Sequence, residues 1–218
     1  MAKRKTKETR EDSAAPKPLT LSQDRLLKAV QAHPLTFATG PAGTGKTYLC
    51  AAEAARALRS GQAQALCLTR PNVEAGRPLG FLPGGLQEKY APYLQPFHAV
   101  LEERMGKGFV AGAVKAGTLR PLPLGFMRGT TFRDCWVILD EAQNTTPAEM
   151  KMFLTRIGGN CKVMVTGDLD QQDIPGLSGL EDAARRLRGV QGVAHVEFGV
   201  EDVVRSDLVG RILRAYAG

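Results

Sequence analysis

Residues 40–47 read Gly-Pro-Ala-Gly-Thr-Gly-Lys-Thr, which matches the phosphate-binding loop pattern G-x-x-x-x-G-K-[ST] in full. Gly40 and Gly45 permit backbone turns that a Cβ would block, so that loop N–H groups converge on phosphate oxygens. Lys46 supplies a point charge to the terminal phosphates, and the Thr47 hydroxyl supplies a ligand to Mg²⁺. We expect the nucleotide to contact every residue of this stretch: Gly40, Pro41, Ala42, Gly43, Thr44, Gly45, Lys46 and Thr47.

The loop lies between a predicted strand and a predicted helix, as its mechanism requires. Residues 35–39 are apolar and β-prone, and residues 48–58 are rich in helix formers. Further apolar runs predict strands at 65–69, 135–139, 162–166 and 193–198. Helices are expected at 20–32, 147–157, 181–187 and 207–216, the first two opened by capping boxes at Thr20–Gln23 and Thr146–Glu149. This alternation predicts an α/β fold with a mostly parallel sheet flanked by helices.

Residues 71–133 interrupt the alternation. They are rich in Pro and Gly and hold seven of the thirteen aromatic residues of the chain. Since the segment is long for a connection, we expect an insertion made of loops and short helices. Aromatic side chains among cationic ones suit base stacking, although such residues are more often core.

An acidic pair follows the predicted strand at 135–139. A carboxylate at the carboxyl end of a buried parallel strand lies where α/β sheets bind ligands. We therefore expect Asp140 to hold Mg²⁺, directly or through water, and Glu141 to act as the general base for the attacking water. A nucleotide kinase would not need Glu141, because its nucleophile is a substrate oxygen.

The strand at 162–166 ends in Gly167-Asp168-Leu169-Asp170-Gln171. Gln171 is the best candidate to contact the γ-phosphate or the attacking water and to report hydrolysis. The alternative is a capping turn in which Asp168 bonds to nearby backbone, and the spacing does not decide between the two. Three arginines near strand ends or Gly-rich turns could neutralise transition-state charge, although most arginines are solvated surface groups: Arg70, Arg128 and Arg205.

Charge points to an anionic partner beyond a nucleotide, with simple solubility as the alternative. The net charge is +7, and the excess lies in residues 1–18 and 71–133. Residues 1–18 are polar and predicted to be a disordered basic tail, leaving 19–218 as the folded domain. No apolar stretch approaches a membrane span, and four scattered cysteines fit buried thiols in a reducing cytoplasm.

These motifs together resemble those of the phosphate-starvation-inducible PhoH-like ATPases. The resemblance runs from about residue 20 to the C-terminus. It is carried by eight segments that also include the motifs above: 40–49, 68–76, 79–84, 126–129, 138–147, 150–158, 165–171 and 202–209.

The resemblance implies a RecA-like ATPase core related to superfamily 1 helicases, a cytoplasmic location and roles in RNA metabolism. It also implies that Gln23 reads adenine, that Gln171 senses the γ-phosphate and that Arg205 faces the phosphates, in its own chain or across a subunit boundary. Two positions depart from the family pattern: Thr130 stands where Arg is more frequent, and Ser206 where His is frequent.

Two functions fit the sequence. The first is a Mg²⁺-dependent ATPase that acts on RNA or single-stranded DNA, as an oligomer and preferably a ring, because the chain has a single RecA-like domain. The second is a nucleotide-gated switch that recruits a protein partner and hydrolyses ATP slowly.

Overall fold

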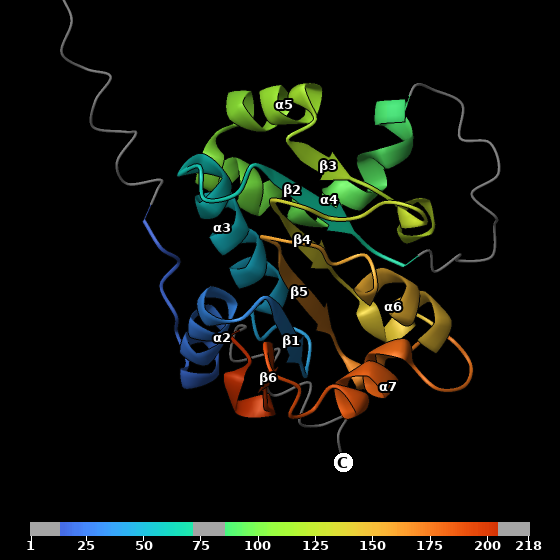
Figure 1. The fold of residues 1–218 in the computed structure, drawn as a ribbon. Helices are drawn as coiled ribbons and strands as arrows, with labels where there is room; N and C mark the ends of the chain where they lie inside the picture. Colours follow the sequence, from blue (N-terminus) through green and yellow to red (C-terminus); the bar gives the residue numbers. More distant parts are fainter. Residues whose placement is uncertain (1–13, 72–85, 205–218) are drawn as a thin grey trace, which may run out of the picture.

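The computed structural model of the chain describes residues 14–71 and 86–204, with the backbone alone for 86–94. Its centre is a six-stranded sheet in the order β3-β2-β4-β5-β1-β6, in which all five pairings are parallel (Figure 1). The strands are β1 (Leu35–Thr39), β2 (Ala65–Thr69), β3 (Leu119–Pro121), β4 (Cys135–Leu139), β5 (Lys162–Gly167) and β6 (Val193–Glu197).

Helices cover both faces of the sheet. One face carries α2 (Leu21–Ala32), α3 (Lys46–Arg59), α4 (Leu86–Met105) and α5 (Lys107–Ala116), and the other carries α6 (Pro147–Leu154) and α7 (Gly179–Arg186) (Figure 1). Successive strand residues point to opposite faces, so Ala38 packs in the first core and Phe37 in the second. A parallel sheet buried on both faces explains why the strands read as continuous apolar runs.

The strand order decides where the polar motifs meet. β5 lies between β1, which leads into the phosphate loop, and β4, which leads into the acidic pair. The register aligns Thr39 with Gly167 and Leu139 with Val165, so these strands end at the same edge of the sheet. The sheet confirms the predicted α/β class, with the strand arrangement of a RecA-like P-loop NTPase.

The two predicted helix starts differ in detail. Thr146 and Glu149 form a complete capping box, and Pro147 occupies the first helical position. Thr20 accepts from the backbone N–H of Gln23, but the Gln23 side chain does not return to Thr20. That side chain is engaged with the phosphate loop instead, as described below.

The middle segment contains more regular structure than we expected. The helix α4 has 20 residues and includes Pro92 and Pro96, which argue locally against a helix. β3 has three residues and pairs in parallel with β2, so this segment extends the sheet. A three-residue edge strand ending in proline is too short to leave a periodic pattern, which is why sequence reasoning missed it.

All four cysteines are free and buried, as expected. Within the described residues, none of the helices has the length and apolar character needed to cross a bilayer. Residues 1–13 of the tail expected at 1–18 lie outside the described residues, as do the helix expected at 207–216 and the positions of Arg205 and Ser206. Residues 14–18 are described without helix or strand, and Pro16 is buried.

Candidate functional site

A cavity of about 270 Å³ opens at the carboxyl ends of β1, β5 and β4. The phosphate loop and the start of α3 form one wall. Asp140 and Glu141, which follow β4, and Asp168 and Gln171, which follow β5, form the other. The fold thus brings together the three motifs that the sequence predicted separately.

Two glycines set the backbone conformation of the phosphate loop. Gly40 has a φ of 132°, and a Cβ added there would overlap the carbonyl oxygen of Phe198. Gly45, with a φ of 85°, is the residue from which α3 starts, so that the first N–H groups of the helix face the loop. These positions require glycine for conformation and for space, as a phosphate cradle needs.

Lys46 lies inside the loop and is 7% exposed. Its ammonium donates to the carbonyl oxygens of Gly40 and Pro41 at 2.6 and 2.7 Å. Burial lowers the pKa of Lys46, and the nearby carboxylates of Asp168 and Asp140 oppose that shift. The loop therefore holds a desolvated cation that a bound phosphate would stabilise.

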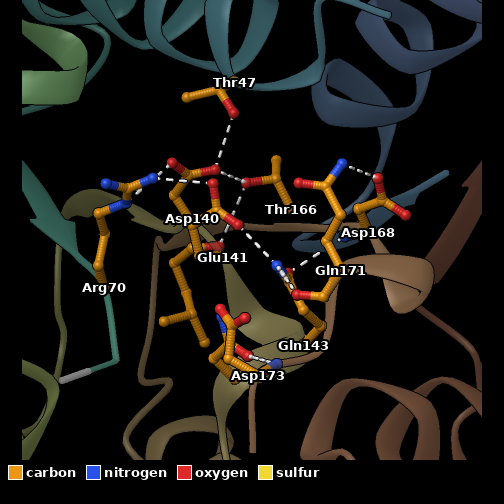
Figure 2. Close-up of polar contacts among 11 residues, drawn as sticks. Thr47, Arg70, Asp140, Glu141, Gln143, Thr166, Asp168, Gln171 and Asp173 are labelled. Carbon is orange, nitrogen blue, oxygen red and sulfur yellow. Dashed lines mark hydrogen bonds and ion pairs between the residues drawn. The ribbon is translucent and has the colours of Figure 1, made fainter. Parts of the chain in front are cut away.

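Hard oxygen donors converge beside Lys46. Oδ1 of the buried Asp140 accepts from the hydroxyls of Thr47 and Thr166 at 2.7 and 2.6 Å (Figure 2). Magnesium in nucleotide sites takes one or two carboxylates together with phosphate and hydroxyl oxygens, so this donor set fits the ion. Thr47 and Asp140 are the residues predicted to bind it, and the fold places them in direct contact.

Both oxygens of the Glu141 carboxylate are engaged. Oε1 accepts from Nη2 of Arg70 at 2.9 Å, and Oε2 accepts from Nε2 of Gln143 at 2.6 Å (Figure 2). Glu141 has a φ of 55°, in the left-handed region, at the point where the chain leaves β4. The turn directs the side chain to the rim of the cavity, where it is 42% exposed and open to water.

Gln143 connects Glu141 to the segment that follows β5, and the sequence analysis did not predict this role. Its Oε1 accepts from the backbone N–H of Asp168 at 3.1 Å, while Nε2 also reaches the carbonyl oxygen of Gln171 at 3.3 Å. Gln143 lies two residues after the acidic pair in a buried turn, η2 (Ala142–Asn144). Only its proximity to Glu141 in the sequence could have signalled this role.

The Asp168 side chain caps the local turn and also contacts the phosphate loop. Its Oδ1 caps the local turn by accepting from Asp170 N, as the capping alternative expected. Its Oδ2 accepts from the phosphate-loop N–H of Ala42 at 2.9 Å and from Nε2 of Gln171 at 2.7 Å. Asp168 therefore connects Gln171 to the phosphate loop, and Gln171 lines the cavity.

Gln23 lies behind the loop. Its Oε1 accepts from Leu19 N at 2.7 Å, and its Nε2 donates to the carbonyl oxygen of Thr44 at 3.0 Å. The contact fixes α2 against the loop.

Val204, the last described residue before Arg205, donates its N–H to Gly43 O at 3.0 Å. Arg128 follows η1 (Leu124–Met127) and is not among the residues that line the cavity.

A family model described as PhoH-like protein matches residues 16–217. The PhoH-like protein of Bacillus subtilis (strain 168) is 48% identical over 199 residues, which cover 90% of this chain and 62% of that protein. Protein PhoH of Escherichia coli (strain K12) is 47% identical over 200 residues, which cover 90% of this chain and 56% of that protein. The chain spans roughly three fifths of the length of these curated relatives.

Among solved structures, the Pif1 helicase from Candida albicans aligns with a TM-score of 0.42 at 17% identity, over 84% of this chain and 40% of that one. The replication initiator DnaA bound to AMPPCP and single-stranded DNA aligns with a TM-score of 0.38 at 14% identity. The alignment covers 90% of this chain and 50% of that chain. At these TM-scores neither protein bears on the site. The sequence match and the fold agree that the chain belongs to the PhoH-like family and has the architecture of a P-loop NTPase.

Proposed function

We propose that the chain binds ATP with Mg²⁺ and hydrolyses it. The observation that carries this proposal is the convergence of the phosphate loop, the Thr47–Asp140 contact and Glu141 on one cavity. Residues 19–218 would form one ATPase domain, working in the cytoplasm.

The residues would divide the chemistry among them. Loop N–H groups and Lys46 bind the phosphates, and Thr47 and Asp140 hold the metal ion, which neutralises charge developing on the phosphates. Glu141 lies at the rim of the cavity, where it would accept a proton from the attacking water. Gln171, in contact with Asp168, would respond to the γ-phosphate.

Gln23 and Arg205 would complete the ATP site. Gln23 lies against the loop through Thr44, which leaves its proposed contact with adenine to a rearrangement of that side chain. Arg205 lies outside the described residues, and its proposed role is to face the phosphates, in its own chain or across a subunit boundary.

The proposed substrate of the ATPase cycle is RNA or single-stranded DNA. Support comes from the basic middle segment, where the 68% exposed Phe126 lies two residues before Arg128, after the edge strand β3. Because the strands are parallel, β3, which precedes this pair in the chain, ends at the same edge of the sheet as the strands that border the cavity. The RecA-like domain would supply one side of a strand-binding cleft, and we propose that a second copy of the chain supplies the other, in a homo-oligomer, preferably a hexameric ring.

Two measurements test this function. Purified protein should release phosphate from ATP only with Mg²⁺, and its affinity for a single-stranded oligonucleotide should fall with salt. If about six phosphates are neutralised, the double-logarithmic slope should be about −4. No phosphate release with or without nucleic acid would refute the ATPase, and no binding at low salt would refute the nucleic-acid partner.

A nucleotide-gated switch is the second candidate, because both oxygens of Glu141 are engaged, which favours slow hydrolysis. Stimulation of the ATPase distinguishes the two functions. Stimulation by RNA or single-stranded DNA favours the motor, whereas stimulation by a protein partner alone favours the switch.

A further inference from the structure

Arg70 is the first residue after β2 and bridges the acidic pair that follows β4. Its Nε lies 3.2 Å from Oδ2 of Asp140, and its Nη2 lies 2.9 Å from Oε1 of Glu141 (Figure 2). One guanidinium thus contacts the proposed metal ligand and the proposed general base together. The planar guanidinium offers separate N–H donors to the two carboxylates, whereas a lysine would have to reach both from one nitrogen.

The sheet fixes this bridge. β2 and β4 pair in parallel, with Thr69 opposite Leu139, and Asp140 N donates to the carbonyl oxygen of Thr69 at 3.0 Å. The ends of both strands are therefore held together, and Arg70 leaves β2 directly beside Asp140 and Glu141. Its side chain is 28% exposed, so the ion pairs are only partly screened by water.

The Arg70 contacts oppose the binding of a metal ion at Asp140 and the approach of water to Glu141. The guanidinium lies at Oδ2 of Asp140, and Thr47 contacts Oδ1 of the same carboxylate. A divalent cation bound by Thr47 and Asp140 would be repelled by the guanidinium at short range, so each cation weakens the binding of the other. Each carboxylate oxygen of Glu141 already accepts one hydrogen bond, Oε1 from Arg70 and Oε2 from Gln143, so an attacking water must share an oxygen with one of these donors. A metal ion at Asp140 therefore weakens the Arg70 contacts, which would leave Oε1 of Glu141 without its cationic partner.

We propose that Arg70 is a positioning residue that restrains Glu141 and competes with the divalent cation for Asp140. Release of Arg70 frees Glu141 for the attacking water, so the restraint sets the basal rate of hydrolysis. This rests on the proposed ATPase function. It differs from the sequence expectation that Arg70 neutralises transition-state charge, because Arg70 faces the carboxylates and not the phosphate loop.

Metal affinity tests the competition without any turnover. Mn²⁺ binding to the full chain, with and without a non-hydrolysable ATP analogue, can be followed by electron paramagnetic resonance. Removing the positive charge in Arg70→Met should tighten Mn²⁺ binding by about tenfold, whereas Arg70→Lys should stay within about threefold of the wild type. The matched control is Arg188→Met, which removes an exposed ion pair with Glu197 elsewhere. Unchanged, weaker or undetectable Mn²⁺ binding in Arg70→Met would overturn the competition.

Hydrolysis tests the restraint on Glu141. At saturating ATP and Mg²⁺, without nucleic acid, Arg70→Met should raise kcat about fivefold and leave KM within twofold, since a partly exposed ion pair is lost. Arg70→Lys should lie between Arg70→Met and the wild type. A fall in kcat would overturn the restraint and favour a transition-state role. Should the wild type release no phosphate at all, the proposed function fails, and the Mn²⁺ titration still decides the competition at Asp140.

Discussion

The two walls of the cavity are built differently. The phosphate-loop wall is one continuous stretch of backbone, shaped by Gly40 and Gly45 at positive φ and lined by the buried Lys46. The acidic wall consists of side chains that follow two strands, β4 and β5, held by ion pairs and hydrogen bonds that involve Arg70 and Gln143. We expect a wall of backbone to change little on binding, whereas paired side chains can exchange partners. Binding should therefore depend on the first wall and chemistry on the second.

Replacing Lys46 should give the largest effect on the phosphate-loop wall. Lys46→Ala removes the charge proposed to bind the phosphates and should lower the rate of hydrolysis by about a thousandfold, with weaker ATP binding as well. Steady-state phosphate release and nucleotide titration measure the two effects. Lys28→Ala, which removes an exposed pair with Asp24, is the control and should leave both unchanged. Normal turnover in Lys46→Ala would show that the phosphate loop does not take part in hydrolysis.

Gly40→Ala tests whether the backbone wall is rigid. A Cβ there meets the Phe198 carbonyl at a φ of 132°, so we expect a loss of about 3 kcal/mol in the free energy of unfolding. Gly61 has a φ of 75° with nothing near its added Cβ, so Gly61→Ala should lose only about 1 kcal/mol. Denaturant titration compares the two variants. Equal losses would mean that the loop yields to the added methyl group.

Gln143→Leu disturbs the acidic wall without changing a charge. Glu141 and the backbone of Asp168 lose a shared partner, so turnover should fall about tenfold while the affinity for ATP stays near the wild-type value. Gln172→Leu is the matched control, because Gln172 donates to the carbonyl oxygens of Ile174 and Gly176. A drop in affinity as large as the drop in rate would show that the two walls are not separable.

The pH dependence of binding gives the smallest effect. Burial lowers the pKa of Lys46, and bound phosphate favours the ammonium form, so binding takes up a proton once the pH exceeds that lowered value. Affinity for ATP should then fall by up to about tenfold per pH unit at alkaline pH. Lys46→Met should lack this slope. A wild-type affinity that stays flat up to the ordinary lysine pKa would contradict the burial of this charge.

The same contrast explains what the sequence could reveal. The loop is contiguous, so its residues, its flanking strand and its helix are legible from local pattern, and Asp140 and Glu141 follow from an apolar run with an acidic end. The pairing of Arg70 with Glu141 depends on β2 lying beside β4, and 71 positions separate the two residues. No local pattern encodes that neighbourhood, so Arg70 appeared only as one of several arginines and Gln143 not at all.

The edge of the sheet was harder to predict than its centre. β1, β4 and β5 are buried on both faces and read as apolar runs, whereas β3 has three residues in a segment rich in Pro and Gly. Likewise, prolines at positions 92 and 96 obscured a helix of 20 residues. Tertiary packing overrides local propensity in both places.

Glu141→Gln is the most direct test of the claim that the phosphate-loop wall binds ATP and the acidic wall carries out hydrolysis. The substitution keeps the size of the side chain and removes its basicity, so hydrolysis should fall by about a hundredfold or more while ATP binding remains. Single-turnover phosphate release and equilibrium nucleotide binding, measured on the same preparation, give both quantities. The account predicts retained binding with lost turnover. Retained turnover would contradict the role of Glu141, and lost binding would contradict the division between the two walls.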